Sequence, residues 1–251
     1  MAATRLLDAE HIAVRYRSCT GAEVESTLDR VVVDEVAGGV PVREFRWYKG
    51  RRHYSGWYWS SKMRRMVVYE SRLELARIML ADFDPMVVAI AAQPLQLNGF
   101  DGARTRRHVP DLLLVDRIGG VTVVDVKAPH KRDDPQVQAL MAWTRDVVSL
   151  RGWGFEEWYG APRQVLANVG FLAGYRRDTV VDQRLVPQVC AAVGAGSTIV
   201  DVERSLAGRD AAMVRPVVLH LVWGGVLVTD LTVPLGGLSV VRPSRSPDVA
   251  G

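Results

Sequence analysis

Residues 108–129, HVPDLLLVDRIGGVTVVDVKAP, constrain the fold more than any other stretch, because two strongly apolar segments flank a Gly-Gly turn. Segments that are apolar on both faces are typical of central, buried strands. Asp111, Asp125 and Lys127 nevertheless stand within or beside them. A buried carboxylate is costly unless it is neutralised, paired or bound to a metal. The sequence therefore predicts a buried strand pair that carries a polar site.

The register of this strand pair decides whether the two carboxylates can meet, because side chains alternate between the faces of a strand. Asp111 stands opposite Asp125 only if Val115 pairs with Val121, which leaves residues 116–120 as a loop. An ideal two-residue turn would instead shift the register by one and send the carboxylates to opposite faces. Glycines suit either turn, so both registers are open at this point.

In the first register, the carboxylates of Asp111 and Asp125 and the carbonyl of Val126 converge, and Mg²⁺ (or Mn²⁺) prefers such oxygen ligands. A metal there would polarise a phosphodiester and help to form hydroxide from water. The cationic Lys127 would orient that water or stabilise charge on the phosphate. Without metal, Asp111 would be an unpaired buried acid whose removal stabilises the fold. The structural alternative is that Asp111 caps a strand while Asp125 pairs with Lys127.

A helix is predicted over residues 68–81, because apolar residues recur there at helical spacing and Asp84-Pro85 ends the pattern. Glu70 and Glu74 lie one turn apart on it, and such like-charged pairs weaken an isolated helix by about 0.2–0.5 kcal/mol. A cation nearby would explain the pair. Neighbouring arginines offer an ordinary surface explanation instead.

Segment 43–65 combines eight basic residues and seven aromatic rings with a single acid. Cations neutralise phosphates and planar rings pack on bases or sugars, so this composition predicts a nucleic-acid surface. An amphipathic strand pair with solvated arginines is the alternative, and the two interpretations are compatible. The DNA contacts expected here and just before Pro110 are Arg46, Lys49, Arg51, Arg52, Arg64, Arg65, Arg106 and Arg107.

Further elements surround the strand pair. Residues 11–68 are strand-rich, with β-branched runs such as RVVVDEV, and residues 87–97 predict a strand broken near Pro94. The clearest helix begins at Pro135 with Asp133 or Asp134 as N-cap, and residues 155–159 predict a short strand.

Four regions follow from these patterns: a strand-rich N-terminal extension (1–44), an α/β core (45–160), a helical region (161–242) and a flexible polar tail (243–251). Several short helices and then two short strands, in LVTDLTVPLGGLSVV, suggest a winged-helix module in the third region. Its candidate recognition helix, RPVVLHLVWGG, is nearly all apolar, which favours protein docking slightly over DNA reading.

The compartment is expected to be the cytoplasm, with no membrane partner. Cys19 and Cys190 are far apart, which suits a reducing environment without a disulfide framework. The N-terminal segment lacks the apolar region of a signal peptide, and residues 214–228 are too short and too polar for a membrane span. The five histidines show no zinc-binding spacing.

Pro110-Asp111 followed by Asp125-Val126-Lys127 resembles the P-D-(D/E)-x-K nuclease motif. Together with these residues, YESRLELARIMLADFDPMVVAIAAQPLQL (69–97) resembles the TnsA-like endonuclease subunit of heteromeric transposases. The likeness covers residues 45–160 well and the C-terminal part by layout only. It implies an α/β fold with a restriction-endonuclease-like core, a mixed central sheet flanked by helices, and a C-terminal winged-helix-like domain.

The resemblance also implies roles for individual residues. Asp111, Asp125 and the Val126 carbonyl would hold the metal, and Lys127 would be the catalytic lysine. The family's helix acid lies in an S-x-L-E setting, which places Glu74 among the catalytic residues and metal ligands. Two accessory positions remain, for which the likeness supplies no firm role: Glu70 and Gln93.

The activity implied is a Mg²⁺-dependent DNA endonuclease that cuts at the 5′ ends of a mobile element. A DDE-type transposase would cut and join the 3′ ends, and an ATPase regulator would contact the winged region. One alternative is a free-standing restriction, defence or repair nuclease, whose chemistry would be identical. Another is a non-catalytic DNA-binding adaptor, against which the complete set of Glu74, Asp111, Asp125 and Lys127 speaks.

Overall fold

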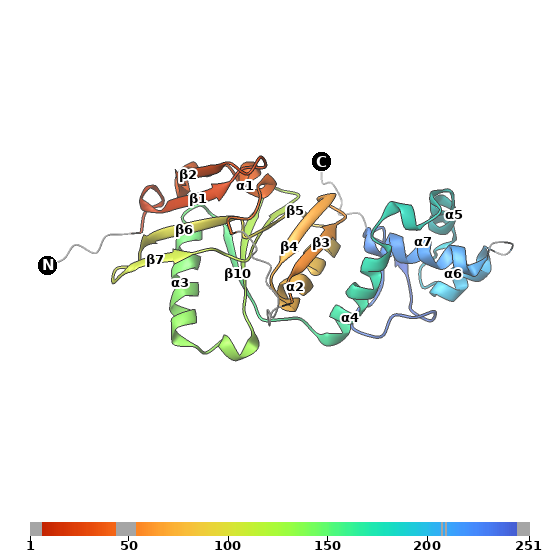
Figure 1. Ribbon diagram of the computed structural model, residues 1–251. Coiled ribbons are helices and arrows are strands. Elements are labelled where there is room, and N and C mark those ends of the chain that lie inside the picture. Colours follow the sequence, from red (N-terminus) through yellow and green to blue (C-terminus); the bar gives the residue numbers. More distant parts are fainter. Residues whose placement is uncertain (1–6, 44–53, 207, 209, 245–251) are drawn as a thin grey trace. The chain divides into compact units, whose positions relative to one another are not determined.

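The computed structural model describes residues 7–43, 54–206, 208 and 210–244 (Figure 1). The fold is mixed α/β, with antiparallel pairing in every sheet and several helices, as predicted for the class. The chain divides into two compact units. Unit 1 comprises Met1–Asp82 and Met86–Gly160, and unit 2 comprises Phe83–Pro85 and Ala161–Gly251.

The predicted strand pair forms the centre of a four-stranded sheet in unit 1. Its order is β10-β9-β8-β5, where β9 and β10 run parallel and the other neighbours run antiparallel. The strands are β5 (Val87–Ala92), β8 (Leu112–Asp116), β9 (Val121–Val126) and β10 (Gly154–Trp158). Most residues of β8 and β9 are buried, which explains why both read as continuous apolar runs.

The register of β8 and β9 is the one that brings the two carboxylates together. Val115 lies opposite Val121, as the first alternative required. The turn between them closes with a hydrogen bond from the Asp116 N–H to the Gly120 carbonyl (2.9 Å), and Gly119 adopts a φ of +85° that favours glycine. The two-residue turn is thereby excluded.

A second four-stranded sheet of unit 1 is antiparallel throughout, in the order β2-β1-β6-β7. Its strands are β1 (Ala13–Arg17), β2 (Glu23–Thr27), β6 (Leu95–Phe100) and β7 (Thr105–His108). β5 and β6 together confirm the strand predicted to break near Pro94. Proline lacks an N–H for a strand ladder, which accounts for the break.

The prediction of strand over RVVVDEV was wrong, because α1 (Val33–Gly38) forms there. Asp34 and Glu35 lie in its first turn, where the helix dipole favours acids, and Val36 is buried in the core. Glu35 also accepts a hydrogen bond from the Tyr16 hydroxyl (2.5 Å). These tertiary contacts outweigh the β-propensity of the valines.

A two-stranded sheet of β3 (Gly56–Ser60) and β4 (Arg65–Tyr69) precedes α2 (Arg72–Phe83). The helix predicted over 68–81 therefore begins later than expected, because residues 68 and 69 pair with β3 instead. The described part of unit 1 also contains three short 3-10 helices: η1 (Ala9–His11), η2 (Leu28–Arg30) and η3 (Pro129–Lys131).

Helix α3 (Pro135–Ser149) begins as the sequence predicted. Asp134 is the N-cap and accepts hydrogen bonds from the N–H groups of Gln136 (3.0 Å) and Val137 (3.5 Å). Its inner face belongs to the main hydrophobic core, which it shares with both four-stranded sheets; core members include Trp143, Val147, Val148, Leu97, Leu113 and Val123.

Unit 2 is helical, with α4 (Arg163–Leu172), α5 (Val186–Ala192), α6 (Ile199–Ser205) and α7 (Ala211–Trp223). Short 3-10 helices lie at η4 (Ala173–Tyr175), η5 (Asp178–Val180) and η6 (Gln183–Leu185). Helix α7 contacts α4, α5 and α6, and seven of its residues are buried. Its apolar sequence, which favoured a docking role, is thus explained by burial within unit 2.

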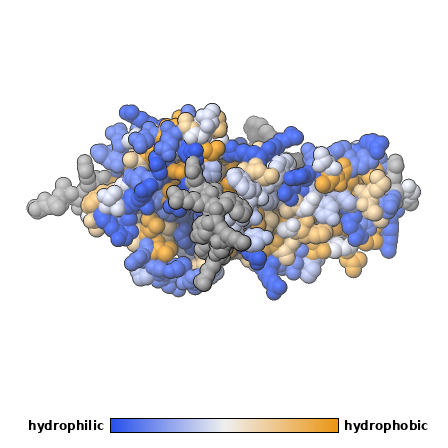
Figure 2. Space-filling view, in the orientation of Figure 1, coloured by the Kyte–Doolittle hydropathy of each residue, from blue (hydrophilic) through white to orange (hydrophobic). Residues whose placement is uncertain are grey.

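The two strands expected within residues 227–241 do not form as predicted: β11 (Leu227–Val228) has two residues, and its partner β12 (Arg242–Pro243) lies just beyond that segment. The buried side chain of Asn168 donates to the carbonyls of Leu231 (2.8 Å) and Val233 (2.7 Å), replacing ladder hydrogen bonds. Apolar side chains such as Leu238 remain exposed here, and hydrophobic and hydrophilic residues are interspersed on the surface (Figure 2). Within the described residues, the helices are all too short or too polar to cross a membrane.

Candidate functional site

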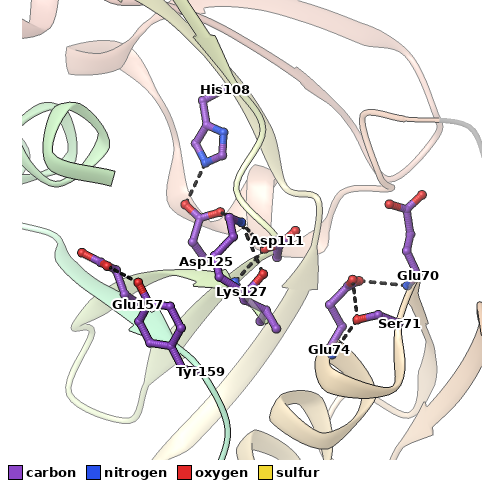
Figure 3. A network of polar contacts seen from close by, with 10 residues as sticks. Glu70, Ser71, Glu74, His108, Asp111, Asp125, Lys127, Glu157 and Tyr159 are labelled. Atoms are coloured by element: carbon purple, nitrogen blue, oxygen red, sulfur yellow. Dashed lines mark hydrogen bonds and ion pairs between the residues drawn. The ribbon is translucent and has the colours of Figure 1, made fainter. Parts of the chain in front are cut away.

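The ammonium group of Lys127 lies among three oxygen atoms (Figure 3). Its Nζ is 3.0 Å from Asp125 Oδ1, 3.2 Å from Asp111 Oδ2 and 3.3 Å from the carbonyl oxygen of Val126. These oxygens come from the same three residues whose oxygens the sequence assigned to a metal. A single cation can therefore contact the whole oxygen set, although here the cation belongs to the protein.

Backbone hydrogen bonds hold these residues in place. The N–H of Val126 donates to Asp111 Oδ2 (2.7 Å), so the carboxylate bridges the start of β8 and the end of β9. The N–H of Lys127 donates to the carbonyl of Trp158 (2.9 Å), which extends the β9–β10 pairing by one residue. The backbone of Lys127 is thus fixed at the end of the central strand β9, while its ammonium group contacts Asp125.

Asp125 is fully buried and has a second partner that the sequence analysis did not identify. His108, at the end of β7, has its Nε2 2.7 Å from Asp125 Oδ2 and is itself buried. A buried carboxylate between an imidazole and an ammonium is compensated from both sides. The signal in the sequence was the position of His108, three residues before Asp111. The spacing of the histidines argues only against a zinc site and does not address hydrogen bonding to a carboxylate.

Opposing effects act on the protonation of the three central groups. Burial raises the pKa of Asp111, and the charge of Lys127 opposes that shift only in part. Burial also acts to raise the pKa of Asp125, but the hydrogen bonds and electrostatic interactions with His108 and Lys127 together outweigh it and lower the pKa. Burial acts to lower the pKa of Lys127, yet the carboxylates of Asp125 and Asp111 raise it overall. The lysine is therefore a cation at neutral pH.

Glu74 lies beside this group without a direct hydrogen bond to it (Figure 3). Its carboxylate accepts from the Glu70 N–H (2.8 Å) and from the Ser71 hydroxyl (2.9 Å), at the start of α2. Burial, with the charge of Asp111 adding to it, raises the pKa of Glu74 to about 7. The carboxyl group of Asp111 thus interacts electrostatically with those of both Asp125 and Glu74. The accessory role predicted for the Glu70 side chain stays a prediction. The contact that Glu70 makes with Glu74 is a hydrogen bond donated by its backbone N–H.

In the described part of the chain, side chains alone do not form a metal-binding cluster. Among the residues that the structure describes, no group of three or more His, Cys, Asp and Glu side chains is arranged to hold a metal ion. Asp111, Asp125 and the Val126 carbonyl fit a hard cation by their donor chemistry. Glu74 is instead engaged at its own helix start. The complete metal set, Glu74 included, stays a prediction.

Gln93 connects the site to β5 through a strained backbone. Its φ of +46° is uncommon for a residue other than glycine, and its N–H donates to the carbonyl of Asp111 (2.8 Å). Its own carbonyl accepts from the N–H of Val42 (3.0 Å), and its buried Oε1 has no hydrogen-bond partner among the described residues. Strain of this kind persists only where the surrounding structure imposes it. Gln93 thus positions the Asp111 backbone.

The basic residues predicted to contact DNA differ in their surroundings. Arg46, Lys49, Arg51 and Arg52 lie outside the described residues. Arg64 is exposed, whereas Arg65 donates to the carbonyls of Gly38 (2.7 Å) and Ala37 (2.5 Å) at the end of α1. Arg106 forms an ion pair with Asp101, and Arg107 is exposed.

The aromatic residues in and just before β3 lie partly in the core and partly at the surface. Tyr58 is buried, while Trp57 and Tyr54 are 57% and 60% exposed, so the strand is amphipathic and also presents rings to solvent. The guanidinium of Arg72 lies 4.6 Å above the Tyr54 ring. A cavity of about 490 Å³ beside Trp57 is also lined by Arg17 and Arg65.

Comparison with known proteins adds no family to this description, since no protein-family model and no curated protein sequence matches the chain. The likeness to nucleases therefore rests on the motif residues. Geometry and chemistry of the site have to carry the functional argument.

Proposed function

We propose that the protein is a Mg²⁺- or Mn²⁺-dependent DNA endonuclease of the P-D-(D/E)-x-K type. The observation that carries this proposal is the convergence of Asp111, Asp125 and the Val126 carbonyl on one cationic nitrogen at the end of a buried strand pair. Hard oxygen donors at a single point are what a divalent cation in a nuclease requires.

A purely structural ion-pair network is the competing explanation, and three observations weigh against it. The side chains of Asp111 and Lys127 are each 23% exposed, so the group reaches solvent. Asp111, Asp125 and nearby Glu74 outnumber the cations, and like charges destabilise one another when buried. Gln93 adds backbone strain beside Asp111. A structural pair needs neither surplus carboxylates nor strain.

Each residue has a task in the proposed reaction. Asp111, Asp125 and the Val126 carbonyl would hold the metal, with Glu74 adjacent. When bound, the metal would supply Lewis-acid activation of the phosphodiester and of a water molecule. Lys127, kept protonated by the carboxylates, donates hydrogen bonds that orient the water or stabilise charge on the phosphate. His108 holds Asp125 in place.

The proposal includes a restriction-endonuclease-like core. The mixed sheet β10-β9-β8-β5, with α3 packed against it, supports that architecture. A winged-helix-like character of unit 2 has weaker support, because four helices precede a hairpin of only two residues per strand. Within this proposal the chain acts with a DDE-type transposase and an ATPase regulator, on the resemblance alone.

Nicking of supercoiled plasmid with Mg²⁺ and with EDTA tests the catalytic proposal. We expect Asp111→Asn and Lys127→Ala to lower the nicking rate by about 100-fold or more, because each removes a charge at the reacting phosphate. Asp146→Asn, at an exposed position of α3, is the matched control and should cut normally. Unchanged nicking by Asp111→Asn would contradict the proposal.

The nicking assay also distinguishes a free-standing nuclease from a subunit of a larger complex and from a DNA-binding adaptor. Cutting by the purified chain alone favours a free-standing nuclease, whereas cutting only with co-purified proteins favours a subunit role. DNA binding without cutting in either case would indicate an adaptor and would refute the enzyme. Affinity purification with mass spectrometry identifies the partners to be added.

A further inference from the structure

A basic groove of about 540 Å³ lies between β7 and the beginning of α3 in unit 1. Arg104, Arg106 and Arg107 line one wall, and Lys131, Asp134 and Gln136 line the other. Its lining includes no aromatic side chain. Positive charge without aromatic rings suits a polyanionic backbone rather than a stacked base.

Two of the four cations are already compensated. Arg106 pairs with Asp101, and Lys131 lies 3.1 Å from Asp134. The guanidinium groups of Arg104 and Arg107 are exposed and have no carboxylate partner among the residues that the structure describes. The groove thus has two uncompensated positive charges.

The only acid in the groove lining does not cancel these charges. The carboxylate of Asp134 caps α3 by accepting from the N–H groups of Gln136 and Val137, and it pairs with Lys131. Its hydrogen bonds and ion pair hold its pKa below the ordinary value. Its charge is therefore balanced locally.

Both walls of the groove are close to the candidate site along the chain. Arg107 precedes His108, the partner of Asp125, and Lys131 follows Lys127 by four residues. Four residues span at most about 14 Å of extended chain, which equals about four nucleotide steps of duplex DNA. A strand bound at the site can thus reach the groove within a few nucleotides. β7 also lies at the edge of its sheet, where backbone groups are open to a ligand.

We propose that this groove holds the sugar-phosphate backbone next to the cleaved bond, with Arg104 and Arg107 contacting phosphates. This inference rests on the proposed nuclease function and assigns the path of its substrate. Because the contacts are to phosphates, the groove contributes affinity that does not depend on base sequence.

Fluorescence anisotropy of a labelled 30-base-pair duplex tests the groove, with the full chain in EDTA so that cleavage is absent. We expect the Arg104→Ala/Arg107→Ala variant to bind more weakly, and the slope of log K against log salt to fall by about two. Arg30→Ala/Arg117→Ala is the charge-matched control, because both arginines are exposed in unit 1 and Arg117 follows the opposite end of β8 from Asp111.

Three results would overturn the proposal that this groove binds the sugar-phosphate backbone. One is an unchanged affinity and slope in the Arg104→Ala/Arg107→Ala variant, with folding checked by circular dichroism. Another is an equal loss in the control, which would reflect net charge alone. The third is binding of a polyglutamate peptide that is as tight as DNA and depends on the same arginines.

The failure of the groove is distinguishable from that of the enzyme. If the wild type nicks DNA but the Arg104→Ala/Arg107→Ala variant binds DNA normally, the groove proposal is wrong and the nuclease proposal is retained. If binding depends on Arg104 and Arg107 but no metal supports nicking, the nuclease is wrong. If both hold, the variant should raise KM for nicking several-fold with little change in kcat, since its contacts lie away from the reacting atoms.

Discussion

Asp125 shows how a fully buried carboxylate is tolerated in this core. Lys127 and His108 each place a nitrogen within 3.0 Å of one of its two oxygens. Breaking a buried pair leaves an uncompensated charge that costs several kcal/mol, about 3–5 in measured cases. Asp111 differs from the expectation as well: it accepts from Val126 and Lys127, so it is not an unpaired acid. Its removal should therefore not stabilise the fold.

His108 is expected to position Asp125 for catalysis. His108→Ala should lower kcat by about 10- to 100-fold and raise the Mg²⁺ concentration needed for half-maximal activity, because a ligand loses its orienting partner. His108→Gln retains a donor near Nε2 and should recover part of both effects. Steady-state nicking across a Mg²⁺ titration measures them. Equal activity of His108→Ala and wild type would refute this role.

At the scale of elements, the β3–β4 turn is tied to α2 by one buried carboxylate. Asp82, 1% exposed, accepts from the hydroxyls of Tyr58 (2.9 Å) and Ser60 (2.6 Å) and from the N–H groups of Ser61 (3.0 Å) and Lys62 (3.2 Å). An acid in the last turn of a helix opposes the helix dipole. These hydrogen bonds offset that cost, and they fix the helix that carries Glu74.

Asp82→Ala should therefore lower the free energy of unfolding by about 3 kcal/mol or more, because several buried donors lose their acceptor. Asp82→Asn keeps the shape and one acceptor, so its effect should be smaller. Urea denaturation measures both. The exposed control Asp146→Asn should stay within about 0.5 kcal/mol of wild type. A neutral Asp82→Ala would show that the turn is held by other contacts.

For the whole molecule, a divalent cation bound at the candidate site would couple metal binding to the folding of unit 1. A ligand that binds only the folded state at 100 times its Kd adds about 2.7 kcal/mol of stability. For a chain of this size, that corresponds to a rise in Tm of about 5–10 °C. The candidate site lies in unit 1, so we expect the rise in the transition that unfolds unit 1.

We accordingly expect Mg²⁺ or Mn²⁺ to raise the Tm of wild type and EDTA to reverse the rise, as measured by differential scanning calorimetry. Asp111→Asn should show little of this response, because one of the predicted ligands is then neutral. Asp146→Asn should respond like wild type. A Tm independent of divalent cations up to millimolar concentration would argue against the metal site, whatever the activity assay gives.

Most elements could be predicted because their signals are local. Asp134-Pro135 marks the start of α3, and Pro94 marks the end of β5. The predictions failed where local and tertiary preferences disagree. The valines of α1 favour strand, yet burial of Val36 imposes a helix. In unit 2, the side chain of Asn168 donates hydrogen bonds to the carbonyls of Leu231 and Val233, in a segment whose sequence is typical of strands.

The sequence by itself determined that Asp125 and Lys127 share a face of one strand and that Asp111 can face them in one of two registers, because side-chain alternation is a property of adjacent residues. Only the tertiary structure decided which register forms, that His108 reaches Asp125 and that β7 and the beginning of α3 line one groove. These contacts join separate segments, and how such segments pack is recorded in no local pattern.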